Sequence, residues 1–218
     1  MPGKGDATRE RIHQAALKEF EKRGFRDASL RTIAKEAGVT TGSFYWYYKS
    51  KEDLFAALVG PYYDHLLGIY QETLDGFWQM PREQQKERMG DTGGKGMAQM
   101  LEYMHAHRTE FLILLRGADG TPYDNLLHEL TEREVAATHQ FTKNIAPFQI
   151  GQGEISPEME HIVTSGMFQA LFELILHDIP IEKARVCVRE LHDFYTAGFA
   201  YALRMPLPAY MKERYGAP

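Results

Sequence analysis

Apolar residues recur every three or four positions through most of the chain, and this spacing constrains the fold more than any other feature. Two early groups would each cover one face of a helix: Ile12, Ala15, Ala16 and Phe20, and then Leu30, Ile33, Ala34 and Ala37. A longer group runs from Phe55 to Phe77. The sequence contains no convincing alternating run and no Asn-Gly or Asp-Gly hairpin signal between β-branched segments. The pattern therefore predicts an all-α fold.

Capping residues and glycines divide this pattern into separate helices. Ser50 and Asp53 fit a capping box, and Thr121 with Asp124 fits a second one. Pro61 falls inside the longest helix, where we expect a kink because proline cannot donate a backbone hydrogen bond. The expected helices are 7–23, 29–37, 41–47, 51–78, 82–89, 95–107, 109–116, 122–145, 157–177 and 180–204.

A glycine-rich stretch, Gly90 to Gly96, is the one place where the helical pattern weakens. A phosphate-binding loop requires a lysine followed by serine or threonine at a helix start, directly after a strand. Here Lys95 is followed by Gly96 and no strand precedes it. We therefore interpret the stretch as a flexible interruption between two helices.

Composition excludes several other classes of protein. The 218 residues include one cysteine, Cys187, so a disulfide scaffold or a cysteine-based zinc site is not expected. The chain has no apolar run of about 18 residues and no signal-peptide pattern, which predicts a cytoplasmic protein without a membrane contact. No His-x3-His pair and no Gly-x-Ser-x-Gly signature occurs. We therefore expect no metal, no cofactor and no enzymatic activity.

Charge is distributed unevenly along the chain. Residues 1–51 carry 11 lysines and arginines against 6 acids, whereas the rest of the chain carries 14 against 24. A basic segment on an acidic protein favours a polyanionic partner for that segment alone, although a chance imbalance on a solvated surface would look the same.

Residues 30–49 have the pattern of a helix, a tight turn and a second helix. Ala34 is small enough for two helices to cross closely, and Gly38 suits the positive φ of the turn. The second helix begins after Thr40 and carries hydroxyl and aromatic side chains without an acid. A helix-turn-helix places such a helix in the major groove of DNA, so the motif and the basic segment together predict DNA binding.

Residues 8–60 resemble the DNA-binding region of the tetracycline-repressor (TetR) family of bacterial regulators. The pieces that carry the resemblance are Arg11 to Phe20, Gly24-Phe25, Ser29 to Ala34, Ala37-Gly38-Val39, Gly42 to Tyr45 and Tyr47 to Leu54. Beyond residue 60 the resemblance lies only in the helical character of the chain.

The resemblance implies a role in DNA binding for nine residues. Thr41, Gly42 and Ser43 would approach base edges, and Tyr45, Tyr47 and Lys51 would reach phosphates. Arg31 and Thr40 would contact the DNA backbone, and Trp46 would stack on a sugar or pack against a thymine methyl. Phe44 and Tyr48 would belong to the core instead.

The resemblance also implies three parts to the chain: a helix-turn-helix domain over residues 1–50, a helical effector-binding and dimerisation domain over 51–205, and a tail over 206–218. The apolar segments 162–177 and 186–203 would form a homodimer. A largely apolar or aromatic small molecule would bind in the larger domain. Its candidate contacts, each of which also suits a plain core or surface position, are Tyr62, Tyr70, Trp78, Met100, Met104, Phe111, Leu115, Arg116, His128 and Phe168.

The leading hypothesis is thus a repressor that a small effector releases from a palindromic operator in double-stranded DNA. An alternative is a TetR-like regulator without a small ligand, controlled by a protein partner. An enzyme on a helical scaffold and a helical adaptor for an acidic protein are further alternatives, and neither would select a DNA palindrome.

Overall fold

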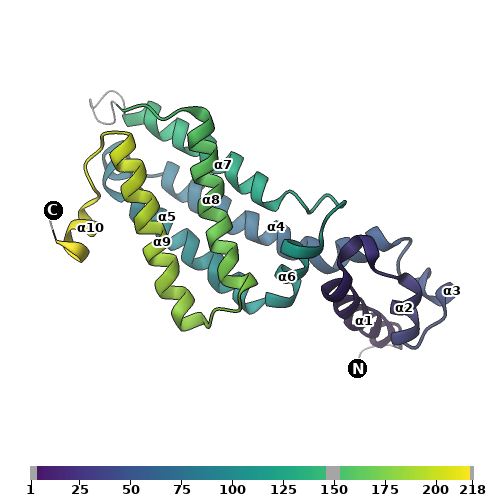
Figure 1. Cartoon of the computed structure of the whole chain (residues 1–218). Helices are drawn as coiled ribbons and strands as arrows, with labels where there is room; N and C mark the ends of the chain where they lie inside the picture. Colours follow the sequence, from purple (N-terminus) through teal and green to yellow (C-terminus); the bar gives the residue numbers. More distant parts are fainter. Residues whose placement is uncertain (1–3, 146–152, 217–218) are drawn as a thin grey trace. The chain divides into compact units, whose positions relative to one another are not determined.

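The structure is a computed structural model that describes residues 4–145 and 153–216. Over these residues the chain forms helices joined by short connections, and no strand occurs among them (Figure 1). The prediction of an all-α fold is therefore confirmed. None of the described helices combines the length and the apolar character that crossing a membrane requires.

Contacts divide the chain into two compact units. The first unit comprises residues up to His65 together with His107–Leu126, and the second comprises Leu66–Ala106 and the chain from Leu127 onward. The first unit holds α1 (Lys4–Asp27), α2 (Leu30–Glu36), α3 (Thr41–Phe44), the first half of α4 (Lys51–Trp78) and α6 (Arg108–Gly117). The second holds the rest of α4, α5 (Arg82–Ala106), α7 (Leu126–Ile145), α8 (Pro157–Leu176), α9 (Ile181–Ala202) and α10 (Ala209–Tyr215).

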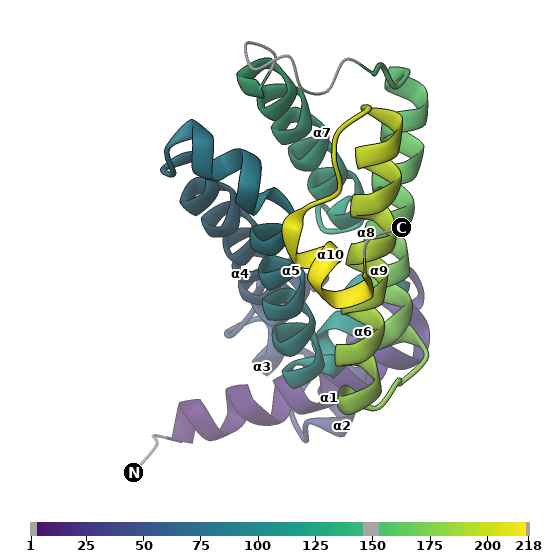
Figure 2. The ribbon, with the colours of Figure 1, turned by 90° about the vertical axis from the view of Figure 1, so that its left-hand side faces the viewer.

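These units do not follow the boundary expected at residue 50. The start of α4 groups with the first unit because Phe55 packs among the phenylalanines of α1. Residues 107–126 also group with it, since α6 packs along α1. The predicted tail contains the helix α10, which the sequence pattern did not indicate. Figure 2 shows α10 beside α9, and Arg214 of α10 pairs there with the buried Asp193.

Three phenylalanines form the centre of the first unit. The Phe55 ring on α4 lies 5.0 Å from the Phe20 ring and 5.1 Å from the Phe25 ring, both edge-to-face. All three side chains are buried. Such aromatic pairs contribute more stabilising free energy than the burial of their apolar area alone. The cluster therefore fixes α1 against the start of α4.

Two glycines allow α1 and α6 to approach closely. Gly24 interrupts the helical geometry of α1 with a φ of 69°. A Cβ atom added at Gly117 would lie 2.9 Å from the Cα atom of Gly24, closer than real side chains come to a backbone. Any side chain at Gly117 would therefore push the two helices apart.

The glycine-rich stretch is not an interruption, which corrects the sequence interpretation. Helix α5 runs without a break from Arg82 to Ala106. Glycine is needed here for packing: a Cβ atom at Gly90 would lie 2.6 Å from Tyr210 Oη, and one at Gly96 would lie 2.6 Å from Thr73 Cγ2. Tertiary contacts with neighbouring side chains thus outweigh the weak helix propensity of glycine.

The second predicted capping box is also wrong. Helix α7 begins only at Leu126. Before it, the Thr121 hydroxyl accepts a hydrogen bond from Tyr123 N (3.1 Å), and the Asp124 carboxylate accepts one from Gly120 N (3.1 Å). These bonds hold a turn before the helix. By contrast, α4 does begin as expected, and it continues through Pro61.

Replacing Gly117 by alanine should destabilise the first unit by about 1–3 kcal/mol, the usual cost of overpacking. Urea unfolding followed by circular dichroism measures this change. Gly5→Ala is the matched control, because nothing lies within 4 Å of a Cβ atom at that position. Equal stabilities of the two variants would contradict the close contact of α1 and α6.

Candidate nucleic-acid interface and internal cavity

Helix α2 and the turn after it form a compact support for α3. The Ser29 hydroxyl caps α2 by accepting a hydrogen bond from Thr32 N. Ile33 and Ala34 are buried, and Gly38 takes the turn with a φ of 67°. The sequence prediction of a helix, a glycine turn and a second helix is therefore confirmed.

Helix α3 is short and presents its first residues to solvent. Thr40 Oγ1 accepts a hydrogen bond from Ser43 N at 3.0 Å and lies 2.8 Å from the Ser43 hydroxyl. Phe44 is fully buried, so it anchors the helix from the opposite side. Thr41, Gly42 and Ser43 are consequently exposed together on one surface. The helix was expected to reach residue 47, but it ends at Phe44 and continues as turns.

Aromatic side chains extend this exposed surface. Tyr45 is 52% exposed and Trp46 is 90% exposed, which is unusual for such large apolar rings. Tyr47 is partly exposed. Tyr48 is buried and hydrogen-bonded to His13, and burial lowers the pKa of that imidazole. The placement of Phe44 and Tyr48 in the core is therefore confirmed.

The two candidate cations differ in their surroundings. Arg31 on α2 is exposed. The Lys51 ammonium instead donates hydrogen bonds to the Arg26 and Ala28 carbonyls, at 3.0 and 3.2 Å, and lies 4.6 Å from the centre of the Phe25 ring. Lys51 thus ties the start of α4 to the segment just after α1.

The start of α4 carries the capping box expected from the sequence, with one change. The Ser50 hydroxyl accepts a hydrogen bond from Asp53 N at 3.1 Å. The Asp53 carboxylate accepts one from Lys49 N at 3.0 Å, where the capping-box pattern predicts Ser50 N. The aromatic turn before α4 is therefore joined directly to the helix start.

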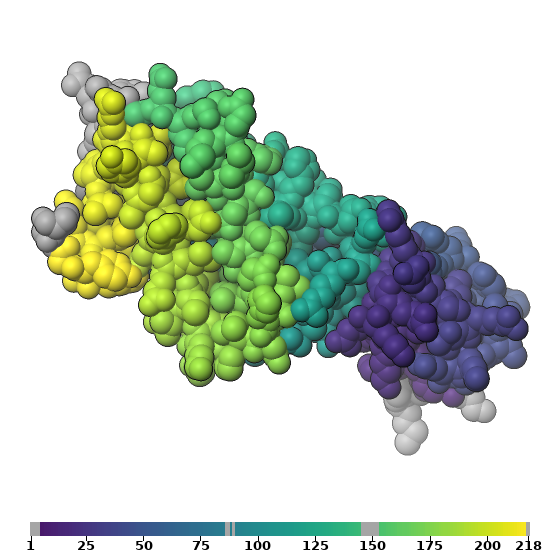
Figure 3. Space-filling model, in the orientation of Figure 1, coloured from purple at the N-terminus to yellow at the C-terminus, as the bar shows by residue number. Residues whose placement is uncertain are grey.

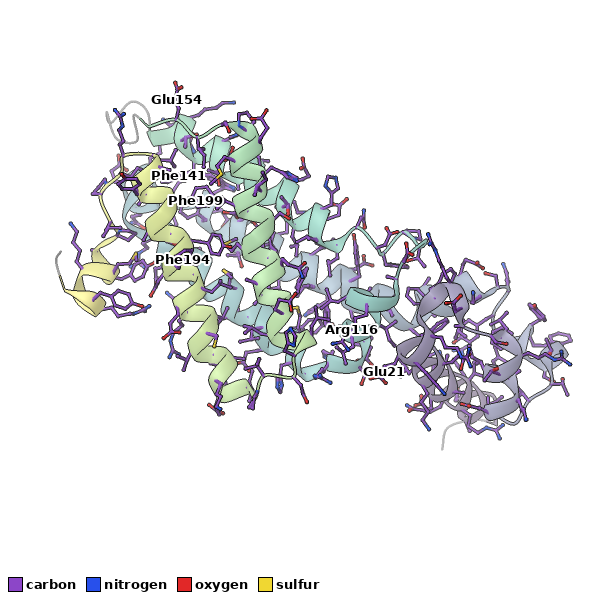
Figure 4. The ribbon with its side chains drawn as sticks, in the orientation of Figure 1. Glu21, Arg116, Phe141, Glu154, Phe194 and Phe199 are labelled. Atoms are coloured by element: carbon purple, nitrogen blue, oxygen red, sulfur yellow. The ribbon has the colours of Figure 1, made fainter. Side chains whose placement is uncertain are left out.

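The second unit contains a cavity of about 140 Å³ between α4, α5, α7, α8 and α9. Six aromatic side chains line much of it: Tyr70, Phe77, Phe141, Phe168, Tyr195 and Phe199. Figure 4 labels Phe141 on α7 and Phe199 on α9, which both line the cavity. Gly90, Gly93 and Gly96 form part of the α5 wall, where neighbouring side chains pack closely against the helix.

Of the ten candidate effector contacts, the structure brings Tyr70 and Phe168 together at this cavity. Their rings meet edge-to-face with centres 5.6 Å apart. Trp78 lies outside the lining, packed against Phe77 and Phe141. Met100 and Met104 are fully buried elsewhere in the second unit.

The remaining five candidates also lie outside the cavity. Four of them belong to the first unit: Tyr62, Phe111, Leu115 and Arg116. The Tyr62 ring lies beside the His107 ring, and Phe111 is part of a buried core. His128 is exposed on α7. Helical spacing placed these residues on apolar faces, but it could not show which unit each face belongs to.

Sequence reasoning missed several lining residues on α9. His192, Thr196 and Phe199 follow one another at helical spacing and face the cavity. We assigned this helix only to dimerisation, although the same spacing was a usable signal. Thr196 Oγ1 lies 3.3 Å from His192 Nε2, and burial lowers the pKa of this imidazole.

Comparison with known proteins connects the first unit to a family. Residues 12–58 match the sequence profile of the bacterial regulatory proteins of the tetR family. The HTH-type transcriptional regulator YdgC of Bacillus subtilis is 40% identical over 74 residues, which are 34% of this chain and 38% of that protein. The HTH-type transcriptional repressor KstR2 of Mycolicibacterium smegmatis is 35% identical over 74 residues, 34% of this chain and 36% of that protein.

The match thus spans little more than a third of the length of these curated relatives. A solved structure extends the likeness in fold. The TetR family transcriptional regulator PfmR from Thermus thermophilus has a TM-score of 0.62 and 16% identity, covering 86% of this chain and 94% of that one. Residues 12–58 are therefore similar to the DNA-binding region of TetR-family regulators, as the helix-turn-helix pattern predicted.

Loss of the Thr40 cap should destabilise the helix-turn-helix. We expect Thr40→Ala to cost about 1 kcal/mol, because the Ser43 amide loses its acceptor. Thr41→Ala is the matched control, since no hydrogen bond of the Thr41 side chain supports α3 in the described residues. Urea unfolding followed by circular dichroism compares the two, and an equal effect of both variants would argue against the cap.

Proposed function

We propose that this protein is a DNA-binding transcriptional repressor, active as a homodimer in the cytoplasm, which a small, largely apolar effector releases from its operator. The single observation that carries the DNA-binding part is the outward face of α3, where Thr41, Gly42 and Ser43 lie next to exposed Tyr45 and Trp46. The name repressor is taken from relatives such as KstR2.

The exposed face of α3 fits the major groove. Small hydroxyl side chains can approach base edges, and Gly42 leaves room for the backbone itself to come close. The tyrosine hydroxyls of Tyr45 and Tyr47 suit phosphate oxygens. A Trp46 ring left 90% exposed has no packing role in the protein, which supports contact with a sugar or a thymine methyl.

Arg31 and Thr40 complete this proposed interface. Arg31 is exposed on α2, where it suits a phosphate. Thr40 has a second role as the cap of α3. We assign Lys51 to the support of the interface, because two backbone carbonyls already accept hydrogen bonds from its ammonium group.

The dimer is proposed from an exposed apolar surface on α8 and α9. Large apolar side chains that remain exposed there are Met159, Ile162, Val186, Phe194 and Tyr201. Phe194 is 74% exposed and Tyr201 is 88% exposed. Figure 3 shows the surface that α8 and α9 form side by side, in green to yellow-green. Several large apolar side chains exposed on two adjacent helices are typical of an interface in soluble proteins.

The effector site is proposed for the cavity in the second unit. Its aromatic lining and its size suit a small apolar molecule. Helix α4 contributes Lys51 to the first unit and Tyr70 to the cavity, so the chain itself connects the effector site to the helix-turn-helix. An effector can weaken DNA binding only if it prefers a state that binds DNA less well.

Selection from random DNA duplexes tests the proposal. The protein should enrich a palindrome, because two symmetry-related copies of α3 would enter major grooves about 34–36 Å apart. Enrichment of no sequence would contradict DNA-binding regulation and favour an adaptor or an enzyme.

Removing the Arg31 charge should weaken binding to all duplexes alike. We expect Arg31→Ala to lower the slope of log affinity against log salt by about one unit, because one phosphate contact is lost. Lys143→Ala is the matched control, since Lys143 is an exposed cation at the end of α7. Fluorescence anisotropy with the selected duplex over a range of salt concentrations measures both slopes, and an unchanged slope for Arg31→Ala would refute its assigned role.

A charge on the α8 and α9 surface should separate the dimer. Phe194→Asp places a carboxylate in the proposed interface and should give a monomer with reduced operator affinity, whereas Phe194→Tyr should remain dimeric. Gly198→Leu should act similarly, because a Cβ atom there meets nothing within 4 Å in its own chain. Sedimentation velocity distinguishes the monomer from the dimer. A Phe194→Asp variant that remains dimeric would show that the interface lies elsewhere on the protein.

A further inference from the structure

One carboxyl group stands out among the aromatic side chains of the cavity. Glu134 on α7 is part of the lining, and the Tyr70 hydroxyl donates a hydrogen bond to it. Burial raises the pKa of Glu134, yet the side chain keeps part of its surface accessible. This combination is expected for a carboxyl group that is enclosed by protein and faces an internal space.

The neighbours of Glu134 do not supply a compensating positive charge. Among the described residues that line the cavity there is no lysine or arginine. His192 lines it from α9, but burial lowers the pKa of this imidazole and so favours its neutral form. Glu160 on α8 is fully buried, and its negative charge raises the pKa of Glu134 further.

Two basic side chains on the helices that line the cavity have acidic partners of their own. Arg133 on α7 lies 3.9 Å from Glu129, and Lys95 on α5 lies 2.7 Å from Asp91. His139 on α7 lies 2.6 Å from Glu160 Oε2, while Glu160 Oε1 has no hydrogen-bond partner among the described residues. Of Glu160 and Glu134, only Glu134 lines the cavity, and no lysine or arginine among the described residues lines it.

We propose that the cavity binds a small organic monocation that carries an aromatic or branched apolar group, with Glu134 as its counter-charge and the Tyr70, Phe141 and Phe168 rings around it. The inference rests on the proposed function, since it names the chemical class of the effector for the same cavity. An opposite charge favours the ionised carboxylate, and ring faces attract quaternary ammonium groups. A neutral ligand of the same shape would leave this carboxylate without an opposite charge.

The dimensions of the cavity limit the ligand to a compact molecule. Its volume of about 140 Å³ is close to that of an engineered protein cavity of about 150 Å³ that admits benzene. A single ring with a trimethylammonium group is a suitable test ligand.

Binding of such a cation should depend on pH in a defined direction. The raised pKa of Glu134 means that the free protein holds this proton to a higher pH than an exposed carboxyl group does. A cation binds best when the proton has left, so its affinity should rise with pH until Glu134 is ionised in the free protein.

The test compares two probes of equal shape, phenyltrimethylammonium and tert-butylbenzene, by isothermal titration calorimetry on the full chain without DNA. The cation should bind at least tenfold more tightly than the neutral probe. Glu134→Gln should abolish this preference and its pH dependence while it retains tert-butylbenzene binding, which shows that the cavity is intact. Glu132→Gln removes an exposed carboxyl group two residues away and should change neither affinity.

Three results would overturn the inference: tert-butylbenzene binding as tightly as the cation, an undiminished cation preference in Glu134→Gln, or no binding of either probe. These failures are distinct from failure of the proposed function. Selection of a palindrome without any cation binding would leave the DNA-binding regulator in place and remove only this ligand class. Cation binding without an effect on operator affinity would keep the site but contradict its role as the effector site.

Discussion

The helix-turn-helix depends on the edge-to-face packing of Phe55 against Phe20 and Phe25. Helices α2 and α3 have 7 and 4 residues, which is too short for either to be stable alone. They keep their positions because the phenylalanine cluster fixes α1 against the start of α4. The Lys51 ammonium lies over Phe25 and donates hydrogen bonds to the carbonyls of Arg26, in the last turn of α1, and Ala28, just after it, so the same cluster also sets where α4 begins.

The second unit is organised around a different constraint, the enclosure of polar groups in an aromatic interior. A carboxyl group buried without a charged partner is costly, and Glu134 receives a hydrogen bond from the Tyr70 hydroxyl rather than from a cation. An apolar side chain at this position would fill the space at lower cost. A polar group kept in such a place is more readily explained by a ligand than by stability, which gives the cavity its proposed chemistry.

Local signals account for what could be predicted from the sequence. Ser29, Gly38 and Thr40 act within a few residues of themselves, so the helix-turn-helix and the core positions of Phe44 and Tyr48 could be predicted directly. The cavity depends on which faces of five helices meet, and spacing within one helix does not determine that. Met100 and Met104 therefore do not line the cavity, while His192 and Phe199, which do line it, were missed.

The contrast between local signals and contacts across the fold also explains where other sequence predictions and the structure differ. The glycines of α5 looked like a break because their propensity is local, whereas Tyr210 and Thr73, which require them, lie far away in the sequence. Lys51 has the position of a phosphate contact, and that role stays a prediction. Its acceptors on Arg26 and Ala28 are brought to it only by the folded chain, so spacing could not indicate them.

We propose that a ligand in the second unit controls the DNA contact made by the first. Trp46 emission in a Trp78→Phe variant tests it most directly, because Trp46 is then the single tryptophan and lies beside α3. Operator duplex should shield Trp46 and shift its emission, and phenyltrimethylammonium should reverse the shift, but not when Glu134 is also replaced by glutamine. An emission shift that persists while the cation occupies the cavity would contradict the account.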